Sequence, residues 1–264
     1  MTRRKKRRRN LKGQILSFCA AIAFLAAIAL FAIYLRSYIN DRMILKDQDE
    51  LRDMFESGAP KQTSFLFPTA YAEEAEPERP VAERFTELYR INPDVIGWII
   101  AGNEVSTPVV YRDNTYYMDH DFYGKQSAEG TVFADELNAD WENDPYLILY
   151  GHNMKNESMF GSLPKYEEQV YYDEHPNIWL FTPEKNYCIE VVSGFITPAD
   201  STIYTLHSSV DAMRQTLADA AAHSDFVSAA NLDNAERMVV LSTCAYDYED
   251  ARYVLTGVLR ECVQ

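Results

Sequence analysis

The chain has 264 residues, a formal net charge of −15 and 47% hydrophobic residues, which excludes a disordered or low-complexity protein. Four cysteines are too few for a disulfide-stapled scaffold. Eight of the 25 basic residues lie in the first 35 positions, so the body that follows is strongly acidic and poorly suited to binding nucleic acid.

An uncharged apolar run extends from Ile15 to Leu35. As a helix, these 21 residues rise about 31 Å, which matches a bilayer core of about 30 Å. The basic head 1–14 precedes the run and predicts a cytoplasmic N-terminus with the rest of the chain outside the cell. A cleaved signal peptide is the alternative, but the run is long for one and no clean cleavage site follows, which favours an uncleaved signal anchor at 15–35.

The segment 36–80 is predicted to be an extracellular stalk and linker. Its first part, 36–57, carries Ile44, Leu51, Met54 and Phe55 among charged residues, which indicates a short amphipathic helix. Its second part, 58–80, contains four prolines and a glutamate-rich patch, as linkers do.

The segment 81–264 has the pattern of a compact β-rich domain. A helix is expected over 81–90. Short β-branched or aromatic runs bounded by turn residues predict eight strands, at 95–101, 105–111, 131–134, 146–150, 178–182, 187–196, 238–243 and 252–259. Two further helices are expected at 158–168 and, with Ser209 as its cap, at 210–222. This composition indicates a closed barrel or a sandwich rather than a parallel α/β sheet.

Three side chains at strand ends could form a nucleophilic site. Cys244 ends one predicted strand and Arg252 begins the next, so an antiparallel hairpin would return the guanidinium to the level of the thiol. His152 follows an apolar strand at a glycine turn, where an imidazole can act as a general acid and base. A buried inert cysteine and an ordinary loop histidine are the alternatives, because the sequence does not show that the three converge.

Other polar groups carry weaker signals. The run Asp119-His120-Asp121 could bind a metal, but no second cluster has ligand spacing, so a solvated loop and no metal or other cofactor are expected. Cys188 and Cys262 fall on predicted strands, either as buried thiols or as a disulfide pair.

Several segments in order resemble class B sortases. Two of the matching segments carry the candidate site residues, namely 241–244 (LSTC) followed by Arg252, and 150–154 (YGHNM). The other matching segments are 92–98 (NPDVIGW), 108–110 (PVV), 113–118 (DNTYYM), 121–122 (DF) and 159–163 (MFGSL). The resemblance covers the chain from about residue 85 to its end. It implies an eight-stranded sortase β-barrel with peripheral helices over 81–264, on the outer face of a Gram-positive cell membrane.

The resemblance also implies a reaction. Cys244 would attack the carbonyl of a threonine in a sorting signal, His152 would exchange protons with the leaving and incoming amines, and Arg252 would stabilise the oxyanion. An amine of the peptidoglycan cross-bridge would accept the acyl group. Residues matching the family's substrate groove are Asn114, Met118, Ser242, Ile203 and Tyr204. The alternatives are an extracytoplasmic cysteine protease and a non-catalytic wall-binding module on the same barrel.

Overall fold

The computed structural model describes residues 2–57 and 81–262. The chain divides into two compact units, Met1–Asp49 and Glu50–Gln264. The predicted linker over 58–80 lies outside the described residues, as do the side chains of the predicted basic head up to residue 13.

The N-terminal segment is one continuous helix, α1 (Thr2–Ser57). Within it, Gln14–Glu56 contains an apolar stretch that is long and hydrophobic enough to cross a membrane, and none of this stretch is buried. The predicted span 15–35 lies within Gln14–Glu56. The helix expected over 36–57 is present as the continuation of α1, which runs through this segment without a break. No proline or glycine occurs between Arg36 and Ser57 to end the helix earlier.

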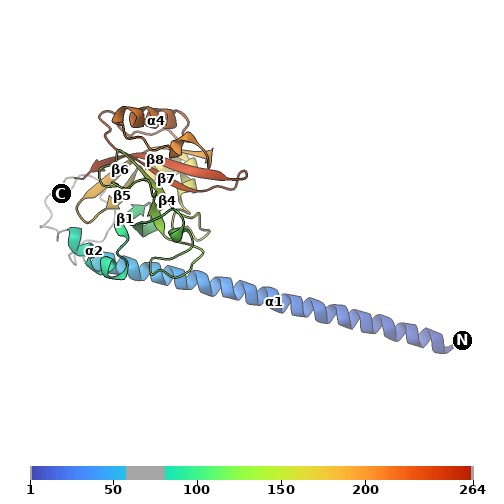
Figure 1. Cartoon of the computed structure of the whole chain (residues 1–264). Helices are drawn as coiled ribbons and strands as arrows, with labels where there is room; N and C mark the ends of the chain where they lie inside the picture. Colours follow the sequence, from blue (N-terminus) through green and yellow to red (C-terminus); the bar gives the residue numbers. More distant parts are fainter. Residues whose placement is uncertain (1, 58–80, 263–264) are drawn as a thin grey trace. The chain divides into compact units, whose positions relative to one another are not determined.

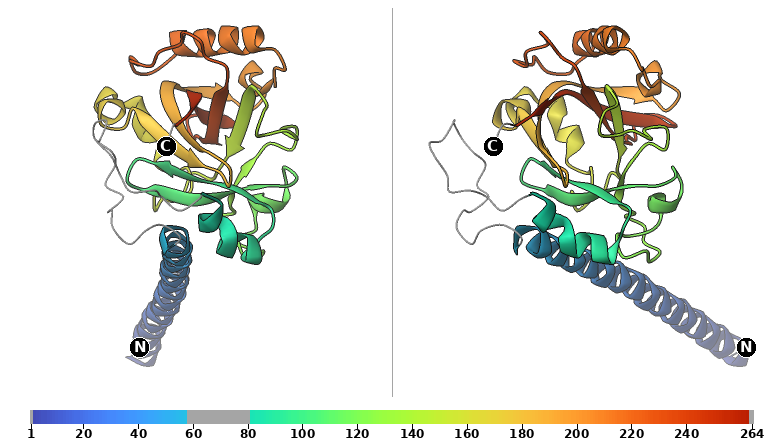
Figure 2. Two further views of the ribbon diagram at one scale, coloured as in Figure 1. Left: turned by 90° about the vertical axis from the view of Figure 1, so that its left-hand side faces the viewer. Right: turned by 60° about the vertical axis from the view of Figure 1, so that its left-hand side comes forward.

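Eight strands close into a barrel, as predicted (Figures 1 and 2). They are β1 (Val95–Ala101), β2 (Val105–Tyr111), β3 (Val132–Ala134), β4 (Tyr146–Tyr150), β5 (Asn177–Phe181), β6 (Asn186–Pro198), β7 (Met238–Cys244) and β8 (Ala251–Glu261). Their order around the barrel is β1-β2-β3-β4-β7-β8-β6-β5. Most neighbours are antiparallel, but β2–β3 and β4–β7 are parallel, and the second of these pairs joins the strands that precede His152 and end at Cys244.

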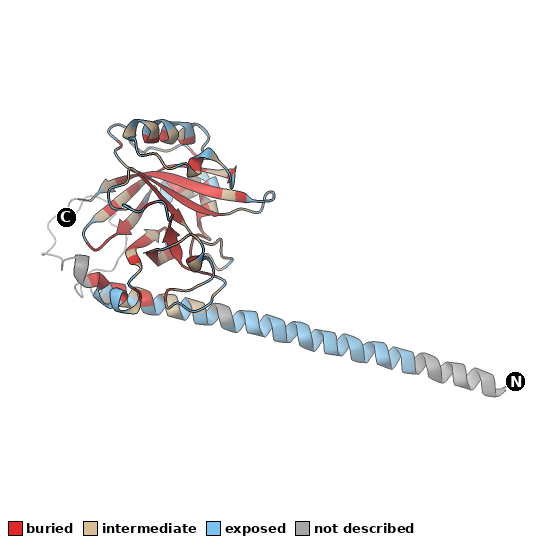
Figure 3. Ribbon diagram, in the orientation of Figure 1, coloured by how far each residue is buried: buried red, intermediate tan, exposed pale blue. Residues whose placement is uncertain are grey.

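Most strand residues are buried, since one face fills the barrel interior and helices cover parts of the other face (Figure 3). The helices α2 (Val81–Ile91) and α4 (Val210–Ala222) lie on opposite sides of it (Figures 1 and 2). Under α4, Met213 and Leu217 pack against the strands. Under α2, the end of α1 joins the core, where Phe55 stacks on Trp98 with ring centroids 4.6 Å apart. The barrel unit therefore begins at Glu50, before the predicted domain start at Val81.

The helix expected over 158–168 is wrong. Residues 163–167 form a 3₁₀ helix, η2 (Leu163–Glu167), and a separate α3 (Gln169–Glu174) follows. A regular right-handed helix cannot include Met159, whose φ is 53°. At Gly161 the chain instead passes so close to the Met154 carbonyl oxygen that a Cβ would not fit. At the predicted cap of α4, Ser209 occupies the N-cap position, but its side chain forms no capping hydrogen bond.

Candidate active site

The strand end that carries Cys244 lies beside Arg252, as the sequence predicts. Cys244 and Arg252 are direct partners in the antiparallel register of β7 and β8. The connecting loop is closed by the amide of Ala245, which donates to the carbonyl of Ala251 at 2.9 Å. Partners in an antiparallel pair point to the same face, so the hairpin puts the thiol and the guanidinium together.

His152 reaches the same place through the parallel pairing of β4 with β7. Tyr150 lies opposite Ser242, and the Gly151 amide extends the ladder to the Ser242 carbonyl at 3.1 Å. The imidazole Nε2 of His152 lies 2.6 Å from the carbonyl oxygen of Met118, at the end of the 3₁₀ helix η1 (Tyr116–Met118). Because a carbonyl only accepts, Nε2 carries a proton and Nδ1 is the nitrogen left to exchange one with a substrate.

The glycine before His152 is needed for space rather than for its backbone freedom. Among the described residues with positive φ, the glycines are Gly102, Gly124 and Gly130, and Gly151 is not one of them. A Cβ at Gly151 would instead lie 2.8 Å from the buried ring of Phe160. The sequence suggested a turn that needs the backbone freedom of glycine, but the structure shows that Gly151 is needed because the His152 loop lies close against the barrel interior.

Asn153 is a site residue to which the sequence assigned no role. Its side-chain Nδ2 donates a 2.7 Å hydrogen bond to the backbone carbonyl of Cys244. This bond ties the loop that carries His152 to the end of β7. The signal was present in the sequence, since Asn153 belongs to the YGHNM motif, but its partner is 91 residues away.

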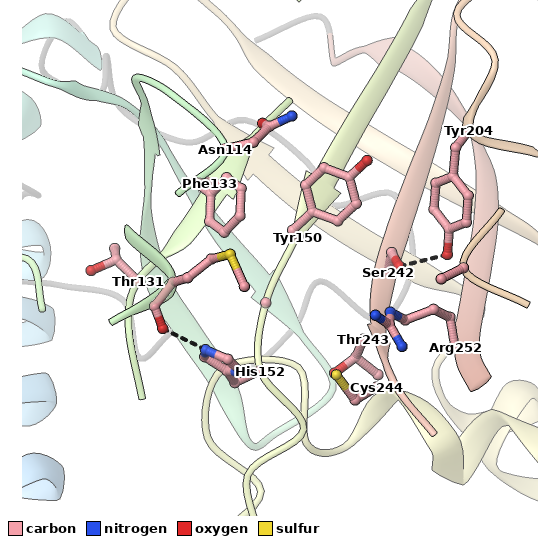
Figure 4. A pocket seen from close by; sticks show the side chains of 13 residues that line it. Asn114, Thr131, Phe133, Tyr150, His152, Tyr204, Ser242, Thr243, Cys244 and Arg252 are labelled. Carbon is pink, nitrogen blue, oxygen red and sulfur yellow. Dashed lines mark hydrogen bonds between the residues drawn. The ribbon is translucent and has the colours of Figure 1, made fainter. Parts of the chain in front are cut away.

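A cavity of about 300 Å³ brings the predicted site together (Figure 4). Figure 4 shows His152 on one side and Cys244 with Arg252 on the other. Seven of the eight predicted residues line it, namely Asn114, Met118, His152, Tyr204, Ser242, Cys244 and Arg252, together with Thr131, Phe133, Tyr150, Gly151, Ala199 and Thr243. Ile203 does not: it is 5% exposed and packs in the core under α4.

This constellation and barrel have known relatives. Sortase B of Listeria monocytogenes is 30% identical over 184 residues, which span 68% of this chain and 75% of that protein. The chain belongs to the sortase B family. Sortase B of Staphylococcus aureus is 26% identical over 218 residues, 81% of this chain and 83% of that one. A crystal structure of sortase B from Bacillus anthracis superimposes with a TM-score of 0.69 at 26% identity, over 85% of this chain and all of that one. No family model matches the chain.

In this sortase B, the wall of the cavity opposite His152 is built by hydrogen-bonded hydroxyls. The Tyr204 hydroxyl and the Ser242 Oγ lie 2.8 Å apart, and burial raises the pKa of Tyr204, so the phenol stays protonated at neutral pH. Tyr204 stacks loosely on Tyr150, with centroids 6.2 Å apart. The wall therefore offers a peptide both an aromatic surface and neutral hydrogen-bonding groups.

Arg252 keeps most of its guanidinium available for a substrate. One nitrogen, Nη1, donates to the carbonyl of Ala251 at 3.0 Å. Among the residues that the structure describes, no carboxylate forms an ion pair with Arg252. A cationic group with free donors beside Cys244 can hold a developing negative charge.

The remaining candidates from the sequence take no part in this cavity. His120 is held locally, since its Nδ1 lies 2.7 Å from an oxygen of Asp119 and its ring stacks on Tyr116. Within residues 2–57 and 81–262, no group of three or more histidine, cysteine or acidic side chains could hold a metal ion. Cys188 and Cys262 are free thiols that interact with each other, and that contact raises the pKa of Cys188.

Proposed function

We propose that this sortase is a membrane-anchored cysteine transpeptidase that cleaves a C-terminal sorting signal after a threonine and transfers the protein to a cell-wall amine. The observation that carries the proposal is the register pairing of Cys244 with Arg252 in the cavity that His152 also lines. These three side chains supply a nucleophile, a group that stabilises an oxyanion, and an acid and base.

In the first half-reaction, Nδ1 of His152 takes the proton of the Cys244 thiol, and the resulting thiolate adds to the threonine carbonyl carbon. The oxyanion that forms is stabilised by the guanidinium of Arg252. When the tetrahedral intermediate collapses, the C–N bond breaks, and His152 gives a proton from Nδ1 to the leaving amine. The product is a thioester between Cys244 and the threonine.

In the second half-reaction, an amine of the peptidoglycan cross-bridge attacks the thioester carbonyl. His152 takes the proton that the amine loses, and the Cys244 thiolate leaves as the new amide forms. The hydrogen bond between Nε2 of His152 and the Met118 carbonyl keeps Nδ1 directed to the cavity through both steps. Neither half-reaction requires a cofactor.

Asn114, Met118, Ser242 and Tyr204 are the side chains we propose to contact the signal peptide, because each lines the cavity beside Cys244. Ile203 enters the proposal only indirectly. It is buried directly before Tyr204, and its carbonyl accepts a hydrogen bond from the Tyr146 hydroxyl, which supports the position of Tyr204.

The apolar stretch of α1 supports a membrane anchor, and the basic residues before it support a cytoplasmic N-terminus. The catalytic domain would then lie outside the cell membrane, where the peptidoglycan acceptor is. A membrane-impermeant maleimide added to intact cells should label Cys244 in this orientation, and should leave it unlabelled in the opposite one.

The activity is tested with the full chain in detergent and a panel of fluorogenic sorting-signal peptides, with and without hydroxylamine or a cross-bridge-like amine. We expect cleavage after threonine, with the amine attached to the threonine by mass spectrometry. Cys244→Ala should abolish the reaction and Cys188→Ala should retain it. Hydrolysis that ignores the amine would identify a protease instead, and undiminished function of Cys244→Ala would identify a non-catalytic binding module.

A further inference from the structure

Asp135 is a buried carboxylate next to the cavity but not in its lining. It directly follows β3 and is 6% exposed. Its Oδ2 accepts from the Asn114 side-chain nitrogen at 3.2 Å and from the Tyr150 hydroxyl at 2.9 Å, and its Oδ1 accepts from the Leu137 amide at 2.9 Å. Three donors on one buried carboxylate hold it in a single orientation, since losing any of them would leave a buried charge less well satisfied.

The contact with Asp135 determines how Asn114 presents its amide. A carboxylate can only accept, so the atom that faces it is the Asn114 nitrogen. The Asn114 Oδ1 accepts from the Glu136 amide at 2.8 Å, which is consistent with the same orientation. One N–H of the Asn114 side chain is left, together with one lone pair of its oxygen, at a position that lines the cavity.

The second donor, Tyr150, connects Asp135 to the catalytic loop. Its ring packs against Phe133 and Tyr204, with centroids 5.4 and 6.2 Å away, and the chain continues directly into Gly151 and His152. Burial, with the nearby Asp135 charge, raises the pKa of Tyr150, so the phenol remains a donor at neutral pH. Asp135 thus holds one cavity residue from β4 and one from the loop after β2.

We propose that Asp135 is a positioning residue for substrate binding: through Asn114 and Tyr150 it fixes an N–H donor in the cavity that pairs with a carbonyl group of the bound signal peptide. The inference rests on the proposed function, because it requires that a peptide occupies this cavity. It assigns the free N–H of Asn114 to a carbonyl acceptor, from either the peptide backbone or a side-chain amide.

The test compares Asp135→Ala with Asp144→Ala in the full chain. Asp144 is a matched control, because its carboxylate also accepts from an asparagine side chain at 3.2 Å, that of Asn138, outside the cavity lining. We expect Asp135→Ala to raise KM for the peptide by about tenfold or more. The kcat should change less than about threefold and the rate of Cys244 alkylation by iodoacetamide should stay unchanged, since the reacting groups are untouched. Asp144→Ala should leave KM unchanged.

Asn114→Ala and the double variant Asp135→Ala/Asn114→Ala show whether Asp135 acts through Asn114. If it does, the double variant has a KM close to that of Asn114→Ala alone. The inference would be overturned if the two single changes in KM multiply in the double variant, or if Asp135→Ala has the KM of the wild type. Should Asp135→Ala fail to fold, Asp135→Asn tests the same point. Whichever way its amide is oriented, the NH₂ group replaces one of the two accepting oxygens and faces at least one of the three donors, so that hydrogen bond is lost.

The same double-mutant cycle of Asp135→Ala and Asn114→Ala, measured by thermal unfolding, separates this inference from the proposed function. Coupling between Asp135 and Asn114 in stability reports their hydrogen bond whether or not the enzyme turns over. A wild-type chain that cleaves no peptide would overturn the proposed function and the substrate role of Asp135 together. An active wild type in which the two substitutions are additive in KM and in stability would overturn the positioning role alone.

Discussion

The side chain of Asn153 and the backbone of Cys244 are joined by a 2.7 Å hydrogen bond that links the two halves of the site. Asn153→Ala removes this link while leaving Cys244, His152 and Arg252 in place. Because small displacements of catalytic groups are costly, we expect kcat to fall by about tenfold to a hundredfold. Steady-state kinetics with the cleaved peptide measures this. Asn143→Ala serves as the control, since within the described part of the chain Asn143 bonds only to nearby Asp140. Equal losses in both variants would contradict the link.

Gly151→Ala tests whether the His152 loop needs its close contact with the barrel. The new Cβ would lie 2.8 Å from the Phe160 ring, which is fully buried and cannot move aside freely. We expect an activity loss of about a hundredfold as His152 is displaced. Adding Phe160→Leu should restore part of the activity by making room, and a double variant no better than Gly151→Ala would count against this explanation.

Arg252→Lys tests what the guanidinium contributes beyond its charge. A lysine keeps the positive charge but not the planar set of donors, so the bond to the Ala251 carbonyl and a bond to the oxyanion cannot be kept in the same geometry. We expect kcat to fall by about a hundredfold or more, as for the loss of an oxyanion donor. A Tm equal to that of the wild type would show that the variant remains folded, and an unchanged kcat would contradict this role of the guanidinium.

Asp113 predicts a pH dependence of stability. Its carboxylate accepts hydrogen bonds from the Thr115 hydroxyl and from the amides of Thr115 and Tyr116, which lowers its pKa from 3.8 to about 2. A lowered pKa means that this stabilisation is complete above the unfolded value and is lost as the pH falls toward 2. Asp113→Ala should therefore have a lower Tm than the wild type above pH 5, and the difference should close between about pH 4 and 2.

Thermal unfolding followed by circular dichroism measures this prediction. Asp200→Ala, which removes an exposed carboxylate, is the control and should show no such closing of the difference. A difference for Asp113→Ala that is constant with pH would contradict the assignment. The result matters for the site because these hydrogen bonds hold the start of η1, whose last residue, Met118, positions His152.

Phe55→Ala tests the start of the barrel domain. Phe55 is 1% exposed and packs on Trp98, although 23 residues separate α1 from α2 in the sequence. Removing a buried phenylalanine costs about 3 kcal/mol or more of the free energy of unfolding. Chemical unfolding of the full chain measures this, with Leu137→Ala, 70% exposed, as a matched control. Equal stability of the two variants would place the start of the domain after Phe55.

Much of the fold could be predicted because its signals are local. The bounds of β1, β2, β4 and α4 agree with the apolar runs and their turn residues. The pairing of Cys244 with Arg252 also followed from the sequence, because a short loop between two strands restricts them to a hairpin.

The sequence by itself determined the strands, the apolar helix and the hairpin of Cys244 and Arg252, since these depend on residues close together along the chain. Only the tertiary structure decided what depends on distant residues. The parallel pairing of β4 with β7 brings His152 to Cys244, and a core under α4 takes Ile203 away from the cavity. Asp135 and Asn153 acquire their roles only when residues far apart in the sequence supply their hydrogen-bond partners. Such contacts form because burial leaves these polar groups no water to bond, and no local pattern of residue types records them.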